Sequence, residues 1–224
     1  MTTAAHPRTL LLAGGTSAVG AVVARAALDR GDRVVVVGRD EARLAALERD
    51  LPGIVTAACD LTDEPAVAAL ADRLLGEVGR VDGILHLVGG WRGGGGLAGQ
   101  TEADYRFLEV SFTALRNVTR AFDADLRDSD AGRLAIVSST AVARPLAGGA
   151  NYAAVKAASE AWMRAVAQGF AKAARDAGEP LRAASVIFRV KELDGFEGAL
   201  AEAFLGLWES PADALNDTVI DLTA

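Results

Sequence analysis

The chain has 224 residues, and its formal net charge at pH 7 is −7. This acidic balance argues against a general binder of nucleic acids or of anionic membranes, although a few local donors can still hold an anionic cofactor. Hydrophobic residues make up 51% of the chain, yet no apolar run approaches the roughly 18 residues that cross a bilayer. We therefore expect the apolar residues to form one sizeable buried core.

Cys59 is the single cysteine, so no internal disulfide is expected and a reducing compartment is the default. The first eight residues, MTTAAHPR, lack the apolar stretch of a signal peptide. These features predict a cytoplasmic protein. No spacing of His, Cys, Asp and Glu suggests a metal site.

Apolar runs alternate with segments of helical spacing along the whole chain. The runs predicted as strands span residues 9–13, 33–37, 54–58, 82–88, 133–138, 182–188 and 217–222. The predicted helices lie in the second part of 14–31 and over 41–51, 63–78, 102–127, 151–177 and 196–208. No linker or repeat interrupts this order, and the glycine run 93–96 is too short to separate domains.

This alternation predicts an α/β fold with a parallel sheet covered by helices on both faces. Right-handed crossovers then favour a doubly wound, Rossmann-like sheet of about seven strands. We expect residues 1–224 to form a single domain of this kind.

The first predicted turn has the spacing Gly14-x-x-x-Ala18-x-Gly20, between a strand and a helix. Glycines here let the backbone approach a pyrophosphate, and the helix N-terminus supplies N–H donors. Glycines in such turns also serve packing alone. The turn by itself leaves both interpretations open.

Tyr152 and Lys156 are four residues apart on a predicted helix, so they share one face. An ammonium beside a phenol favours the phenolate, and we expect the pKa of Tyr152 to be lowered. Such a tyrosine can exchange a proton with a carbonyl or alcohol oxygen. Ser139, thirteen positions earlier, could hydrogen-bond the same oxygen. The alternative is an ordinary surface pair.

Together these motifs resemble the short-chain dehydrogenase/reductase family, which has a Thr-Gly-x-x-x-Gly-x-Gly turn, an Asn-Asn-Ala-Gly segment and a Ser…Tyr-x-x-x-Lys site. The similarity runs from about Thr9 to Lys156 and more loosely beyond. Ala13 and Ala18 replace the threonine and the middle glycine of the turn. The resemblance places the following residues at the cofactor: Gly14, Thr16, Ser17, Ala18, Val19, Gly20, Gly89, Tyr152 and Lys156.

The second predicted strand ends in Gly38-Arg39, which offers a guanidinium and no carboxylate. A basic residue here accommodates the 2′-phosphate of NADP, whereas NAD is usually held by an acid. We therefore expect NADP(H) to be preferred, with NAD(H) possible, unless Arg39 is only a solvated charge. Asp60 and Leu61 match the family's adenine-contacting pair, although an aspartate often simply caps a turn.

The resemblance implies an oxidoreductase that interconverts a carbonyl and an alcohol on a small organic substrate by hydride transfer. In it Tyr152 is the catalytic acid/base, Lys156 binds the nicotinamide ribose, and Ser139 positions the substrate oxygen. Ser138 is a neighbouring candidate, but its interval to Tyr152 is one residue too long. Family helices equivalent to 102–127 and 151–177 pair subunits, so a homodimer or homotetramer is expected.

Four positions depart from the family pattern. His86 stands in the asparagine segment and is expected to be a hydrogen-bonded structural residue. Ser111 replaces an asparagine that assists proton relay and is taken as a catalytic residue in its place. Phe188-Arg189 replaces Pro-Gly after the sixth strand, and we expect the covering insertion of many relatives to be missing there. Trp91 and the glycine run 93–96 are then candidates for covering the substrate.

These departures also motivate an alternative, a non-catalytic or weakly active cofactor-binding sensor or interaction subunit of the same fold. A methyltransferase on a similar sheet fits less well. A methyltransferase usually has an acidic residue at the end of the second strand, and its reaction does not need Tyr152 or Lys156.

Overall fold

A computed structural model describes residues 7–191 and 194–222. Residues 1–6, on which the expectation about the N-terminus partly rests, lie outside these ranges. The strands are β1 (Thr9–Ala13), β2 (Arg33–Gly38), β3 (Val55–Ala58), β4 (Gly83–His86), β5 (Arg133–Ser139), β6 (Ala184–Val190) and β7 (Thr218–Asp221). The helices are α1 (Ala18–Asp29), α2 (Glu41–Asp50), α3 (Glu64–Val78), α4 (Glu102–Ala121), α5 (Asp123–Asp128), α6 (Ala150–Ala177), α7 (Glu197–Gly206) and α8 (Ala212–Leu215).

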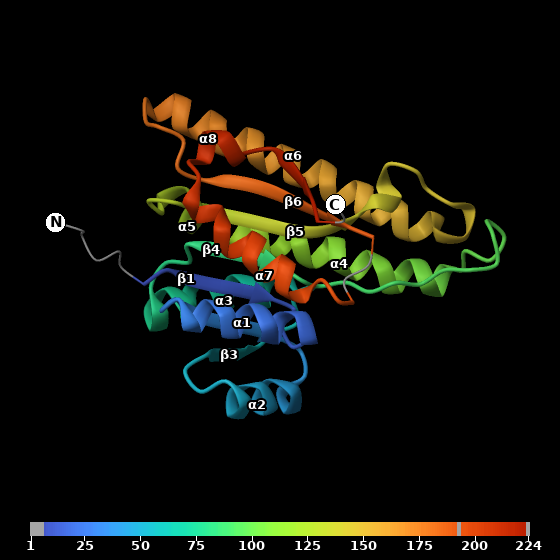
Figure 1. The fold of residues 1–224 in the computed structure, drawn as a ribbon, viewed down its shortest axis with the longest axis horizontal. Coiled ribbons are helices and arrows are strands. Elements are labelled where there is room, and N and C mark those ends of the chain that lie inside the picture. Colours follow the sequence, from blue (N-terminus) through green and yellow to red (C-terminus); the bar gives the residue numbers. More distant parts are fainter. Residues whose placement is uncertain (1–6, 192–193, 223–224) are drawn as a thin grey trace.

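The strands form one seven-stranded sheet in the order β3-β2-β1-β4-β5-β6-β7, and every pairing is parallel. The crossovers run outward from β1 in one direction and from β4 in the other. Figure 1 shows helices on both faces of this sheet. The prediction of a doubly wound, Rossmann-like α/β fold is confirmed.

Each face of the sheet carries its own apolar core, because alternate strand residues point to opposite faces. On one face Leu12 and Phe188 pack with α1 and α7. On the other face Leu11 and Ile187 pack with α3, α4 and α6. In the described ranges no helix combines the length and apolarity that a membrane crossing needs.

Several predicted boundaries shift by one or two residues, and two differences matter for the argument. The helix expected over 102–127 is two helices, because Phe122 leaves the helical conformation and is fully buried between α4 and α5. The sixth strand ends at Val190, so Phe188 and Arg189 lie inside β6, where they pair with β5 and β7. They therefore do not form the loop after the strand, and Val190 and Lys191 stand where that loop begins.

The carboxyl ends of β1 and β4 lie side by side at the point where the crossovers diverge. In open parallel sheets this switch point is where ligands bind. The residues that follow β1, β4, β5 and β6 are therefore the place to look for a site.

Candidate active site

The turn between β1 and α1 is packed so closely that side chains are excluded from two of its glycines. At Gly14, whose φ is +78°, a Cβ atom would lie 2.8 Å from Val88 Cγ2. At Gly20 a Cβ atom would lie 2.0 Å from the carbonyl oxygen of Gly15. Ser17 caps α1 by accepting a hydrogen bond from the Gly20 amide at 3.2 Å. The glycines thus serve local packing as well as any approach of a ligand.

A cleft of about 1150 Å³ opens at the carboxyl ends of β1, β4, β5 and β6. Ser17 and Val19 of the first turn line one part of it, and Gly89 and Trp91 after β4 line another. Ser139, Tyr152 and Lys156 line it together. The structure therefore brings the predicted trio and part of the first turn to one cleft.

Helix α6 presents Tyr152 and Lys156 to this cleft from successive turns. The Lys156 Nζ atom lies 5.8 Å from the centroid of the Tyr152 ring. It donates a hydrogen bond to the carbonyl oxygen of Val137 in β5, at 2.7 Å. Lys156 is thus fixed between its own helix and the strand that carries Ser139.

The prediction that the pKa of Tyr152 is lowered is wrong. Burial raises the pKa of Tyr152, and hydrogen bonding to the Ser139 side chain only partly opposes this. Burial also lowers the pKa of Lys156 to about 8, against a smaller raising effect of the Glu160 charge. Both shifts have one physical cause, because burial disfavours the charged form of either group.

The two serines at the end of β5 have different partners. The Ser139 hydroxyl accepts a hydrogen bond from the Ala141 amide at 3.1 Å and lines the cleft beside Tyr152. The Ser138 hydroxyl donates to Glu160 Oε1 at 2.7 Å. Both serines line the cleft, but the Ser138 hydroxyl hydrogen is committed to Glu160. The predicted role of Ser139 at a substrate oxygen stays a prediction.

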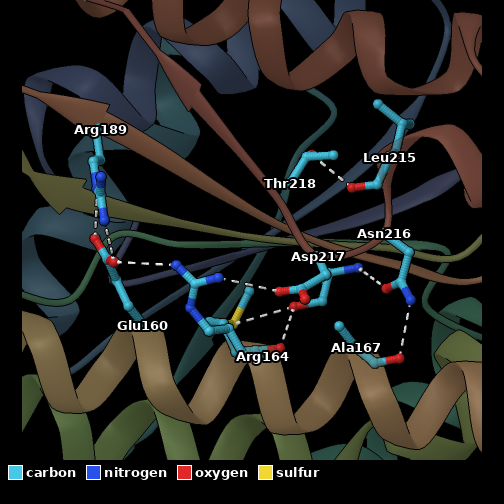
Figure 2. Close-up of polar contacts among 10 residues, drawn as sticks. Glu160, Arg164, Ala167, Arg189, Leu215, Asn216, Asp217 and Thr218 are labelled. Atoms are coloured by element: carbon cyan, nitrogen blue, oxygen red, sulfur yellow. Dashed lines mark hydrogen bonds and ion pairs between the residues drawn. The ribbon is translucent and has the colours of Figure 1, made fainter.

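Glu160 lies one turn beyond Lys156 on α6 and is only 4% exposed. Arg189 of β6 donates to both of its carboxylate oxygens, at 2.9 and 2.6 Å, as Figure 2 shows. Burial raises the pKa of Glu160, but the hydrogen bonds from Arg189 and Ser138 outweigh it, so the pKa is lowered. Arg164 continues this network to Asp217, just before β7 (Figure 2). The Arg189 that replaces a family glycine is thus an ion-pair partner inside the sheet.

His86 lines the cleft and meets Ser111, which lies outside the lining. His86 Nε2 lies 3.0 Å from the carbonyl oxygen of Ser111 and must donate to it, which leaves Nδ1 unprotonated. Nδ1 has no hydrogen-bond partner in the described part of the chain. The prediction of a hydrogen-bonded His86 is confirmed. The Ser111 hydroxyl donates to Leu108 within α4 at 2.8 Å, so its predicted catalytic role stays a prediction.

The pH dependence of folding stability tests the environment of His86. Burial lowers the pKa of His86 to about 4 from 6.5, so the unfolded chain binds a proton more readily than the folded protein. Stability is then complete above pH 6.5 and falls as the pH drops toward 4, by roughly 3 kcal/mol from this residue. We expect the free energy of unfolding of His86→Asn, measured in urea, to fall by about 3 kcal/mol less than that of the wild type over the same pH range. Equal losses in the two proteins would contradict this account.

The residues predicted at the adenine end lie outside the lining of the cleft. Arg39 is exposed after β2, and Asp60 is exposed after β3. Asp60 accepts hydrogen bonds from the Thr62 amide and hydroxyl at 3.0 and 2.7 Å, and these lower its pKa. This is the turn-capping role that the sequence left open. Leu61 is buried in the core, while Thr16 packs against the end of β2 at Gly38.

The glycine-rich loop after β4 is tied to the segment that precedes α6. The Gly94 amide donates to the Gly148 carbonyl at 2.7 Å, and Gln100 Nε2 donates to the same oxygen at 2.9 Å. Trp91 lines the cleft and is 60% exposed. The predicted role of Trp91 as a cover stays a prediction.

Arg144, Val190 and Lys191 also line the cleft, and sequence reasoning missed them. Arg144 lies between Ser139 and Tyr152 in the sequence, and this position could have identified it as a candidate residue of the cleft. Lys191 could be found only once the true end of β6 was known. Glu160 had a signal too, because it continues the four-residue spacing of Tyr152 and Lys156.

Comparison with known proteins agrees with this fold. The family model for the short chain dehydrogenases matches residues 8–174. The chain therefore belongs to the short chain dehydrogenase family, whose members are oxidoreductases, and the resemblance seen in the sequence is confirmed.

Two curated relatives show how far the similarity extends. The chain is 30% identical to the uncharacterized oxidoreductase DltE of Bacillus subtilis over 152 residues, which cover 67% of this chain and 60% of DltE. It is 38% identical to L-fucose dehydrogenase of Bos taurus over 82 residues, covering 37% and 30%. The matches thus span less than two thirds of these relatives.

Solved structures are similar over nearly the whole chain. A metagenomic short-chain oxidoreductase in complex with NADP is 25% identical, with a TM-score of 0.80 and 97% of each chain covered. An NADPH-bound short chain oxidoreductase of Pseudomonas aeruginosa, described as containing an atypical catalytic center, is 21% identical. Its TM-score is 0.79, with 96% of this chain and 95% of that one covered, and this likeness concerns the fold.

Proposed function

We propose that the protein is an NADP(H)-dependent oxidoreductase that interconverts a carbonyl and an alcohol on a small organic substrate. The observation that carries the proposal is the meeting of Ser139, Tyr152 and Lys156 in one cleft with the turn before α1. When bound, the nicotinamide supplies or accepts the hydride. The NADP complex of the 25% identical relative supports a nucleotide of this class.

The residues of the cleft fit such a cofactor. Gly14 and Gly20 let the first turn pack tightly against Val88 and Gly15, which fixes the backbone at the start of α1. The N-terminus of α1 favours negative charge, and Ser17 and Val19 reach the cleft there. Lys156 and Gly89 would hold the nicotinamide end, while Arg39 would meet a 2′-phosphate beyond the cleft lining.

Tyr152 would hold the transferable proton. Its raised pKa keeps the phenol protonated at neutral pH, which suits a proton donor to a developing alkoxide. Ser139 would donate a hydrogen bond to the same oxygen and orient the carbonyl. With a pKa of about 8, Lys156 is largely charged at neutral pH and stabilises negative charge that forms on the tyrosine oxygen.

The choice between NADP(H) and NAD(H) is testable at Arg39. Arg39 is exposed and makes no hydrogen bond or ion pair in residues 7–191 and 194–222, and its charge acts at longer range on Asp60. Its guanidinium can therefore reach a phosphate without breaking a direct contact. We expect Arg39→Leu to weaken NADPH binding about tenfold in calorimetry and to leave NADH binding nearly unchanged. Arg175→Leu, at the far end of α6, is the matched control. Equal affinities of the wild type for NADPH and NADH would contradict the preference.

A cofactor-binding sensor is the second candidate, and the fully buried His86 and altered Ser111 favour it. The two candidates separate in one experiment. Purified protein is titrated with NADPH, NADP, NADH and NAD, and its turnover of a panel of ketones and aldehydes is then measured. Turnover with the preferred reduced cofactor supports the reductase, whereas tight binding without turnover of any carbonyl supports the sensor.

A further inference from the structure

In the part of the chain that the structure describes, the cleft is lined by cations and by no carboxylate. The charged side chains among the described lining residues are Arg144, Lys156 and Lys191, and none of these residues is an aspartate or a glutamate. This is unexpected in a chain with 30 acidic and 23 basic residues. A random part of this surface would carry more acid than base. The cleft is therefore a positive site in a negative protein.

The cations of the cleft rim are also unpaired, unlike most of those elsewhere. Arg106, for example, pairs with Glu102 and Glu109, and Arg182 with Glu179. Within residues 7–191 and 194–222, the basic side chains that make no hydrogen bond, ion pair or ring contact are Arg39, Arg144, Arg175 and Lys191. Arg39, Arg144 and Lys191 follow β2, β5 and β6, so they share the carboxyl edge of the sheet.

Two of these free cations flank the reacting groups. Arg144 stands in the segment that connects Ser139 with Tyr152. Lys191 directly follows Val190, which is the register partner of Ser139 across β5 and β6. Both are exposed and line the cleft, so each can reach a ligand without breaking an existing contact. Arg39, in contrast, lies outside the lining.

We propose that the substrate is an anionic carbonyl compound, an oxo acid, whose carboxylate is bound by Arg144 with support from the charge of Lys191. The proposal rests on the proposed function and names its substrate class. A guanidinium offers two parallel donors to a carboxylate, which fixes the direction of the substrate as well as its affinity. The carbonyl would then lie at Ser139 and Tyr152. The carboxylate is a binding group and takes no part in the bond changes.

Matched pairs of acid and ester test the proposal. Pyruvate, acetoacetate and levulinate are each compared with their methyl esters, using the preferred reduced cofactor. For at least one pair we expect kcat/KM to be about tenfold higher for the acid. Arg144→Leu should remove about that factor for the acid, mainly through KM, and leave the ester within about twofold. Arg175→Leu, an equally unpaired arginine remote from the cleft, should change neither.

Three results would overturn the proposal, and they are distinguishable. Esters reduced as well as acids in every pair would refute an anionic substrate while carbonyl reduction stands. Arg144→Leu and Lys191→Met could instead lower kcat/KM equally for acid and ester and weaken NADPH binding in calorimetry. That result would assign these cations to the phosphates of the cofactor. No turnover of acids, esters or neutral ketones, despite tight cofactor binding, would refute the proposed function itself.

Discussion

Replacing Tyr152 by phenylalanine is expected to lower kcat/KM for carbonyl reduction by about a thousandfold, because it removes the proton donor. The change deletes one hydroxyl that lines the cleft and leaves the helix α6 intact. Cofactor affinity in calorimetry should change little. Steady-state kinetics with the preferred reduced cofactor measures the loss.

The second tyrosine of the chain provides the matched control. Tyr105 is partly exposed on α4 and does not line the cleft. Tyr105→Phe should therefore leave kcat/KM unchanged. If Tyr152→Phe retained wild-type activity, Tyr152 would not be the acid of the reaction.

The largest expected effect on stability lies at Arg189. Arg189→Met would remove both hydrogen bonds that Arg189 donates to Glu160, which is 4% exposed, and leave it only Ser138 and the more distant Arg164. Removing the main partner of a buried charge costs about 3 kcal/mol. Urea denaturation should show this as a lower free energy of unfolding.

A double variant separates the unpaired charge from lost packing. In Arg189→Met with Glu160→Leu the buried charge is gone, and most of the lost stability should return. Lys172→Met, which removes the exposed partner of Asp176, should cost almost nothing. A loss below about 1 kcal/mol in Arg189→Met would show that Arg189 is no more than a surface charge.

The fold and the reacting trio were accessible from the sequence because their signals are local. Apolar runs followed by glycines predicted strand ends at Ala13 and Val37, and the strands end at Ala13 and Gly38. The alternation of strands and helices predicted a parallel sheet. The spacing of Ser139, Tyr152 and Lys156 predicted that they share a site, and all three line the cleft. Periodicity and spacing are properties of the chain itself, so they need no knowledge of packing.

The features that the sequence did not reveal depend on contacts between distant segments. The end of β6 follows from the pairing of Phe188 and Arg189 with β5 and β7 on either side. The break between α4 and α5 coincides with the complete burial of Phe122 in the apolar core on the α4 face of the sheet. Local sequence propensity predicts neither of these two boundaries.

The electrostatics of the site depended on burial as well. The four-residue spacing of Tyr152 and Lys156 suggested a lowered tyrosine pKa, but burial acts on both groups and is the larger effect. Lys156 moreover directs its hydrogen bond to Val137 rather than to the phenol. Spacing identifies which groups meet, whereas their protonation requires the solvent exposure of each.

Isotope transfer tests the central claim most directly. NADPH carrying deuterium at the transferable position of the nicotinamide is incubated with the protein and the carbonyl panel, and the alcohols are analysed by mass spectrometry. We predict deuterium on the carbinol carbon with the wild type and Tyr105→Phe, and its loss with Tyr152→Phe. Saturable NADPH binding with no deuterium in any alcohol would contradict a reductase built on Ser139, Tyr152 and Lys156.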